Sequence, residues 1–240
     1  MNLSIHPTAA AADEAAADVL AGWLTNPGIR TLMLASGNTP IDLYRRIAER
    51  KLSLKHLTIF ALDEYVGVPL DESRNTANLL RRAAVEAWGI APAQFFNVSS
   101  IESDALASIQ QHERRIAEAG GLDAIVLGLG QNGHLAFNEP GSAPDSAGRV
   151  LDLETISIEA NRKWFDGKYA PAKGVTVGLK TILTARRVLI QAYGSHKTAA
   201  AKAMIEGKVG PHCPASFLQN HPNTRVFLDH QAAAALNRRE

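Results

Sequence analysis

One short stretch of the chain gathers residue types that move protons. Residues 127–141, LGLGQNGHLAFNEPG, contain Asn132, His134 and Glu139 between several glycines. An imidazole titrates near neutral pH and a nearby carboxylate can orient it, which is the composition of a general acid–base site. The stretch follows 123–127, an apolar run typical of a strand that is buried on both faces. Open α/β sheets bind ligands beyond the carboxyl ends of such strands, so we expect chemistry here.

The glycines of this stretch also match the G-x-G-x-x-G fingerprint of dinucleotide-binding loops. That fingerprint requires a helix directly after the glycines, and Pro140 and Gly141 interrupt one here. His134 and Glu139 would also have no role in such a loop. We therefore favour an acid–base site, and a loop that only reverses the chain remains the structural alternative.

A second pair of reactive side chains follows another apolar run. Asp63 and Glu64 come directly after 57–62, LTIFAL, which is typical of a buried strand. Adjacent acids are poor packing residues, so they either supply a carboxylate to a site or cap a helix or turn.

Two further segments indicate an anion-binding end. Ser36, Gly37, Asn38 and Thr39 follow the apolar run 31–35 and precede a helix expected over 41–50. The free N–H groups of such a helix start suit a phosphate, although the same residues also suit a plain helix cap. Lys197 stands in the first turn of a helix expected to reach Glu206, where the dipole favours an acid, and a bound anion would explain this cation.

The remaining pattern alternates strands with helices. Strands are expected at 3–5, 174–178, 187–192 and 226–228, and helices at 8–24, 74–88, 104–119 and from His230 onward. This alternation predicts one α/β domain over residues 1–240, built on a doubly wound, mostly parallel sheet flanked by helices. Because parallel strands end at one edge of the sheet, the four polar segments are expected to meet in one pocket.

The segment 142–173 is interrupted by prolines and glycines and is expected to form a lid. It carries Arg162 and Lys163 before two aromatic residues, so it has charge to close over an anionic ligand. A solvated helix face with a buried aromatic edge is the structural alternative.

Composition limits the class of partner. The 240 residues carry 25 basic and 24 acidic side chains, which gives a net charge of +1 and no footprint for nucleic acid or an anionic membrane. We therefore expect a small-molecule partner.

Cys213 is the single cysteine, no basic signal segment opens the chain and no apolar run is long enough to cross a bilayer, so a cytoplasmic protein is expected.

Four motifs in this order, LASGNTP, LDEYVG, LGLGQNGHLAFNEPG and GSHK, resemble the glucosamine-6-phosphate deaminase and galactosamine-6-phosphate isomerase family. That family shares its fold with 6-phosphogluconolactonases, and the resemblance covers nearly the whole chain. The lactonase branch resembles GHTASLFP where this chain has GHLAFNEP, which favours the deaminase branch. The resemblance implies conversion of glucosamine 6-phosphate and water to fructose 6-phosphate and ammonia, in the catabolism of amino sugars such as N-acetylglucosamine. Galactosamine 6-phosphate as the substrate, lactone hydrolysis and a non-catalytic sugar-phosphate sensor remain the alternatives.

The resemblance also implies roles for individual residues. His134 would open the sugar ring, Asp63 would move the C2 proton to C1, and Glu139 would orient the imidazole. No metal or organic cofactor is implied, a sugar phosphate is the implied partner, and a homo-oligomer stays open. The chain also ends without the longer C-terminal extension of allosteric members, which predicts no activation by N-acetylglucosamine 6-phosphate.

Two positions depart from the family pattern. Asn132 stands where some members carry Asp, and Lys163 stands where the lid usually has an Arg that binds phosphate, with Arg162 one place earlier. The other implied phosphate ligands match the pattern, and they are Ser36, Gly37, Asn38, Thr39 and Lys197.

Overall fold

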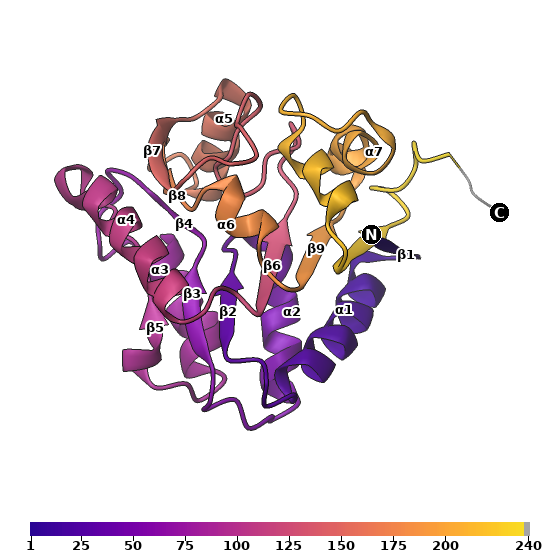
Figure 1. The fold of residues 1–240 in the computed structure, drawn as a ribbon. Helices are drawn as coiled ribbons and strands as arrows, with labels where there is room; N and C mark the ends of the chain where they lie inside the picture. Colours follow the sequence, from indigo (N-terminus) through magenta and orange to yellow (C-terminus); the bar gives the residue numbers. More distant parts are fainter. Residues whose placement is uncertain (238–240) are drawn as a thin grey trace.

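In the computed structural model, which describes residues 1–237, a seven-stranded sheet forms the centre of the molecule (Figure 1). Its order is β1-β10-β9-β6-β2-β3-β5, and neighbouring strands pair in parallel. The strands are β1 (Asn2–His6), β2 (Thr31–Leu34), β3 (Thr58–Ala61), β5 (Phe95–Phe96), β6 (Ala124–Gly128), β9 (Val188–Ala192) and β10 (Thr224–Asp229).

The central strands are apolar on both faces because helices cover both faces. Along β6, Ile125 and Leu127 pack into one apolar cluster, whereas Ala124 and Val126 pack into the other. The continuous apolar runs of the sequence therefore correspond to strands between two helical layers.

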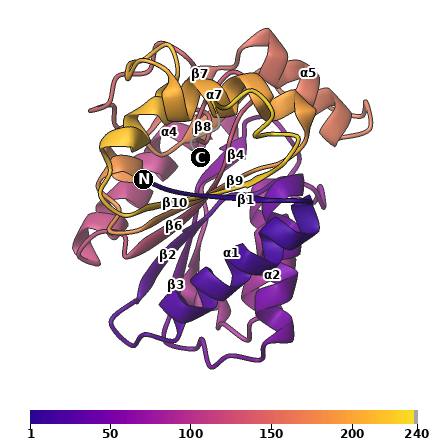
Figure 2. The same ribbon diagram turned by 90° about the vertical axis from the view of Figure 1, so that its right-hand side faces the viewer.

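The two helical layers are filled by different parts of the chain. One layer contains α1 (Ala9–Leu24), α2 (Asn38–Glu49), α3 (Thr76–Leu80) and the π-helical turn η1 (Arg81–Glu86). The opposite layer contains α4 (Glu102–Glu118), α6 (Leu179–Leu183), α7 (Thr198–Glu206) and the 3₁₀-helix η4 (Pro214–Asn220). Short 3₁₀ turns η2 (Pro92–Gln94) and η3 (Ser195–Lys197) precede β5 and α7. Figure 2 shows α1 and α2 on one side of the sheet and α4 and α7 on the other.

A second, antiparallel sheet lies at one end of the molecule. It has the order β4-β8-β7, with β4 (Asp63–Tyr65), β7 (Arg149–Asp152) and β8 (Lys173–Thr176). Helix α5 (Thr155–Trp164) connects β7 to β8 and lies beside them in Figure 1. A third apolar cluster, which includes Tyr65, Phe137 and Phe165, packs these elements together.

The expected fold class, a doubly wound and mostly parallel sheet flanked by helices, is confirmed. The strand expected at 174–178 is present as β8, but it belongs to the small antiparallel sheet. Two other element predictions were wrong, because the irregular segment 142–173 contains β7 and α5 and the helix expected over 74–88 is divided between α3 and η1.

The helix expected from His230 is also absent, because the described residues 230–237 form turns. Its last three positions, 238–240, lie outside the described residues. Alanine has a high helix propensity, but a short segment without an amphipathic face does not stay helical on propensity alone.

No helix within residues 1–237 combines the length and hydropathy needed to cross a membrane.

Candidate active site

The strand order changes direction between β2 and β6, since β3 and β5 follow on one side of β2 and β6, β9 and β10 lie on the other. Loops that leave such a pair of strands diverge and open a crevice at their carboxyl ends. A cavity of about 760 Å³ lies there. Its walls come from the loops after β2, β3, β6 and β9 and from α5, so the expected meeting of four polar segments is what the structure shows.

His134 lines the cavity and is held from behind by Glu139. The imidazole Nδ1 lies 3.1 Å from Glu139 Oε2, which also accepts a hydrogen bond from the Asn132 amide at 2.7 Å. The other carboxylate oxygen, Oε1, accepts from the Ser157 hydroxyl at 2.5 Å. Nδ1 is thereby occupied, and Nε2 is the imidazole nitrogen left for a ligand.

The charge of Glu139 is stabilised at this position. Burial alone raises the pKa of its carboxyl, but the hydrogen bond and charge of His134, with the donors Ser157 and Asn132, lower it to about 2. Asn132 and Glu139 do not line the cavity and act on it only through the imidazole. The Asn132 side chain also accepts a hydrogen bond from the backbone N–H of His134 at 3.2 Å, so one amide contacts both the His134 backbone and the Glu139 carboxylate.

Two glycines of the loop are required by its geometry. A Cβ at Gly130 would lie 2.2 Å from the His134 ring, so only glycine lets the imidazole pack against the backbone. Gly133 has φ +84° and a Cβ there would lie 2.5 Å from the Sγ of Cys213. Gly130 is therefore explained by the placement of the imidazole, and Gly133 by the turn of the backbone beside Cys213.

Asp63 and Glu64 are adjacent but differ in their surroundings. Glu64 accepts three backbone N–H groups, from Tyr65, Thr76 and Ala77, at 2.9, 3.0 and 2.9 Å. Asp63 lines the cavity and receives only the Thr76 hydroxyl at 3.5 Å. Burial raises the pKa of Glu64 to about 7, and its three N–H donors oppose that rise. Because N–H donors favour the charged form and Asp63 has only one hydroxyl, we assign the negative charge of the pair to Glu64, and a structural role with it.

Burial and, after it, the charge of Glu64 raise the pKa of Asp63, the Thr76 hydroxyl lowers it, and the resulting pKa is about 7. A carboxyl with this pKa is matched to proton transfer near neutral pH.

The opposite end of the cavity is suited to an anion. Gly37, with φ 105°, precedes the first turn of α2, and Ser36, Asn38 and Thr39 line the cavity beside it. The Lys197 ammonium enters from the start of α7 and donates to the Leu129 carbonyl at 2.6 Å. Burial lowers the pKa of Lys197 to about 8, because it disfavours the charged ammonium. A negative ligand beside this ammonium would stabilise its charge, so binding of an anion is favoured here.

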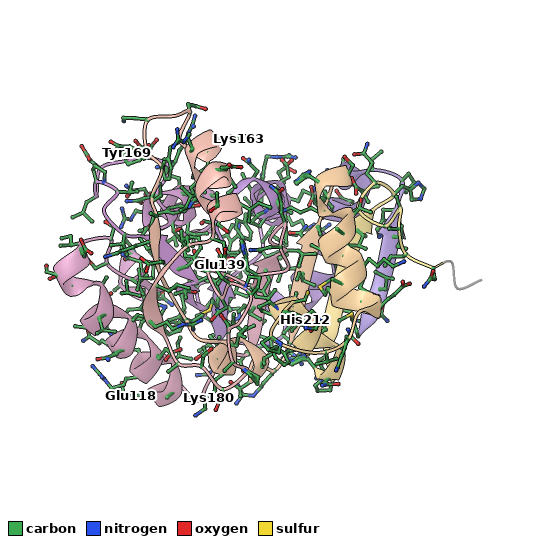
Figure 3. The ribbon with its side chains drawn as sticks, turned by 90° about the horizontal axis from the view of Figure 1, so that it is seen from above. Glu118, Glu139, Lys163, Tyr169, Lys180 and His212 are labelled. Carbon is green, nitrogen blue, oxygen red and sulfur yellow. The ribbon has the colours of Figure 1, made fainter. Side chains whose placement is uncertain are left out.

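The two basic residues of α5 lie differently. Both are exposed, but Lys163 lines the cavity and Arg162 does not. Viewed from above, Figure 3 labels Lys163 on α5 and Glu139 near the middle of the molecule.

Sequence reasoning missed three residues of the site. Ser157 and Thr76 hydrogen bond to Glu139 and Asp63, and Arg74 lines the cavity. A single hydroxyl inside a helical pattern gives no motif, so these contacts appear only when distant segments are brought together.

Within residues 1–237, no group of three or more His, Cys, Asp or Glu side chains is arranged to hold a metal ion.

Known proteins are similar to this chain over most of its length. Residues 6–227 match the family model described as glucosamine-6-phosphate isomerases/6-phosphogluconolactonase. The glucosamine-6-phosphate deaminase of Cutibacterium acnes is 38% identical over 230 residues, covering 94% of this chain and 88% of the relative. The glucosamine-6-phosphate deaminase of Corynebacterium kroppenstedtii is 36% identical over 245 residues, covering 100% of this chain and 94% of the relative.

Solved structures agree with this assignment. A monomeric glucosamine-6-phosphate deaminase superposes with a TM-score of 0.93 at 29% identity, over 98% of this chain and 99% of that one. A 6-phosphogluconolactonase from Trypanosoma brucei superposes with a TM-score of 0.80 at 21% identity, over 98% of each chain, which shows a common fold.

Proposed function

The chain belongs to the family of glucosamine-6-phosphate isomerases and 6-phosphogluconolactonases, and we propose that it is a glucosamine-6-phosphate deaminase. Its reaction converts glucosamine 6-phosphate and water to fructose 6-phosphate and ammonia. The observation that carries this proposal is one cavity lined by Asp63, by His134 with Glu139 behind it, and by an anion-binding end at Lys197.

Ring opening is the first step, and it needs a proton carried from the anomeric hydroxyl to the ring oxygen. His134 performs it through Nε2, because Nδ1 is engaged by Glu139. The carboxylate keeps the ring in one orientation and stabilises the imidazolium that forms during the transfer.

Proton transfer between carbons follows. Asp63 removes the proton from C2 of the open aminoaldehyde and returns a proton to C1, which leaves an imine at C2. Water adds to that imine and ammonia departs, so the C2 oxygen of the ketose comes from water. The raised pKa of Asp63 suits a group that both takes and returns a proton.

The phosphate of the substrate binds at the start of α2, over Gly37, Asn38 and Thr39, with Lys197 as its main counter-charge. Segment 142–173 acts as the lid of a single catalytic domain, and Lys163 on α5 adds a second cation from above. A lysine supplies charge without the two-pronged geometry of the arginine usual in this family. Cytoplasm is the proposed compartment, because a phosphorylated sugar is the substrate and the single Cys213 fits a reducing environment.

The decisive experiment is ammonia release from the purified protein with glucosamine 6-phosphate and, in parallel, galactosamine 6-phosphate. Ammonia from the first sugar, lost in His134→Ala, supports the proposal, and ammonia only from the second assigns the other epimer. Solvent deuterium at C1 of the product separates this chemistry from lactone hydrolysis. Hydrolysis of 6-phosphogluconolactone with no ammonia from either sugar would overturn the proposal.

A further inference from the structure

One set of contacts joins the two sides of the cavity mouth and has no role in the mechanism above. Arg74 lies in the connection from β4 to α3 and reaches across to the end of α5. Its Nη1 donates to the Trp164 carbonyl at 2.6 Å, and its Nη2 lies 2.6 Å from Oδ2 of Asp166. The Trp164 indole N–H donates back to the Arg74 carbonyl at 3.0 Å. We name the three residues Arg74, Trp164 and Asp166 the clasp.

The geometry of the clasp suits an arginine. The guanidinium presents two N–H groups in a fixed fork, one to a carbonyl and one to a carboxylate, and its carbon lies 6.0 Å from the centre of the Trp164 ring. The carbonyl belongs to the last residue of α5, where the helix dipole favours a cation. Arg74 therefore caps the helix that carries Lys163.

A neighbouring pair strengthens the same connection. Lys168, just beyond the clasp, lies 2.9 Å from the carboxylate of Glu72. The loop that carries Glu72 and Arg74 is itself braced, because Asn75 donates to the Pro69 carbonyl and accepts the Asn78 N–H. The loop that holds Arg74 is thus itself fixed by hydrogen bonds.

The clasp joins two parts of the proposed site. On one side, Lys163 immediately precedes Trp164 and lines the cavity. On the other side, Arg74 is two residues from Thr76, whose N–H binds Glu64 and whose hydroxyl reaches Asp63. The position of α5 is thereby tied to the segment that surrounds the catalytic carboxylate.

We propose that Arg74 is a positioning residue that holds the end of α5 over the cavity before substrate arrives, so that Lys163 meets the substrate phosphate. The clasp itself rests on geometry alone, and its kinetic consequence rests on the proposed function. Because the Asp166 and Arg74 side chains are 73% and 40% exposed, their ion pair alone contributes little, and the two hydrogen bonds between Arg74 and Trp164 carry most of the clasp.

Amide hydrogen exchange without ligand tests the clasp directly. The reporters are Phe165, Asp166 and Gly167, whose N–H groups donate to carbonyls of α5. In Arg74→Met we expect these amides to exchange about tenfold faster, with β6 unchanged as the internal reference, because the last turn loses its cap. Arg81→Met is the matched control, since the Arg81 side chain hydrogen bonds only to Asn78 in the preceding turn and does not line the cavity. Equal exchange in both variants would overturn the clasp.

Steady-state kinetics test the positioning role. Arg74→Met is expected to raise KM for the amino sugar phosphate about tenfold while kcat stays within about threefold, because an anchoring contact is lost and the reacting groups are kept. Arg74→Lys should restore part of the affinity, and Asp166→Asn should raise KM in the same direction. Faster exchange with an unchanged KM would overturn the positioning role.

Two outcomes separate competing explanations. A lower KM in Asp166→Asn, with a higher KM in Arg74→Met and normal exchange in both, would make Arg74 a direct phosphate ligand and overturn the proposal. If the wild-type protein releases no ammonia, the proposed function fails, while the exchange measurement still decides the clasp.

Discussion

The imidazole of His134 and the carboxylate of Glu139 meet at one nitrogen, with Nδ1 3.1 Å from Oε2. The carboxylate is 5% exposed and accepts from three side chains, so it has no free face toward the cavity. Its effect on the reaction must therefore pass through the imidazole, and the other ring nitrogen is left to face the substrate.

Replacing Glu139 by glutamine tests this relationship. Glu139→Gln removes the negative charge, and the amide nitrogen that it introduces cannot accept a hydrogen bond. We therefore expect kcat to fall roughly 10²- to 10⁴-fold, the usual contribution of a positioned acid–base group. The measurement is kcat for ammonia release, together with thermal unfolding of the variant. Glu118→Gln, at an exposed position of α4, is the matched control. A kcat within twofold of wild type would remove Glu139 from the mechanism.

The Thr76 hydroxyl is expected to set the acid limb of the pH profile. Burial and then Glu64 raise the pKa of Asp63, the hydroxyl opposes them, and the resulting pKa is about 7. Since Asp63 must be ionised to take the C2 proton, kcat/KM should rise with pH up to about 7 and level between about pH 7 and 8. Thr76→Val removes the hydroxyl, so the limb should move to higher pH. Thr181→Val, whose hydroxyl binds Glu113 instead, should leave it in place. A limb shifted to lower pH would contradict the assignment.

Removing the charge of Asp63 is expected to stabilise the protein while abolishing activity. In the folded state Asp63 holds its proton up to about pH 7, whereas its ordinary pKa is 3.8. Between these values the native state binds more protons than the unfolded state, so stability falls as the pH rises. Asp63→Asn should therefore raise Tm at pH 8 by roughly 5 °C and much less at pH 4. Calorimetry at both pH values checks this, and a lower Tm at pH 8 would refute it.

Lys197 is expected to dominate phosphate affinity. Lys197→Met should raise KM about 10²-fold and weaken inhibition by inorganic phosphate in parallel, because a charge-assisted hydrogen bond is lost. Burial lowers the pKa of Lys197 to about 8, so wild-type KM should also rise above pH 8, and this rise should disappear in the variant. Lys180→Met provides a control on the exposed face of α6. Equal loss of affinity in both variants would argue against a specific phosphate contact.

The two basic residues of α5 are expected to respond differently. Lys163→Arg places a guanidinium fork over the phosphate and should lower KM about threefold or more. Arg162→Met should leave KM within about twofold, because Arg162 is exposed and outside the cavity. Titration with inorganic phosphate supplies the same comparison without turnover. A rise in KM for Arg162→Met alone would reverse the two roles.

Residues that stand next to one another in a polar loop could be placed from the sequence. His134 and Glu139 are five positions apart and meet through their own loop, and the runs before Asp63 and His134 predicted the strands that deliver them. Strand ends converge for geometric reasons, so their meeting at one edge was also predictable.

Contacts that join distant segments were not predictable in this way. Ser157 reaches Glu139 from α5, where the sequence left a lid loop and a solvated helix face as alternatives, and Arg74 contacts Trp164 across 90 positions. Asp63 and Glu64 differ in their hydrogen bonds because only Glu64 lies on the face of β4 that receives the N–H groups of α3. The small sheet was missed because its first strand, Asp63–Tyr65, is three residues long and begins with two acids.

Strands β7 and β8 pair with each other at Asp152 and Lys173, so the segment between them leaves and returns at the same place. The proposed catalytic groups lie outside that segment, Asp63 on β4 and His134 on the loop after β6. Changing the length of such a returning segment costs little chain entropy. If this segment is the lid we propose, its length can change, and with it the size of sugar that fits, while Asp63 and His134 stay in place.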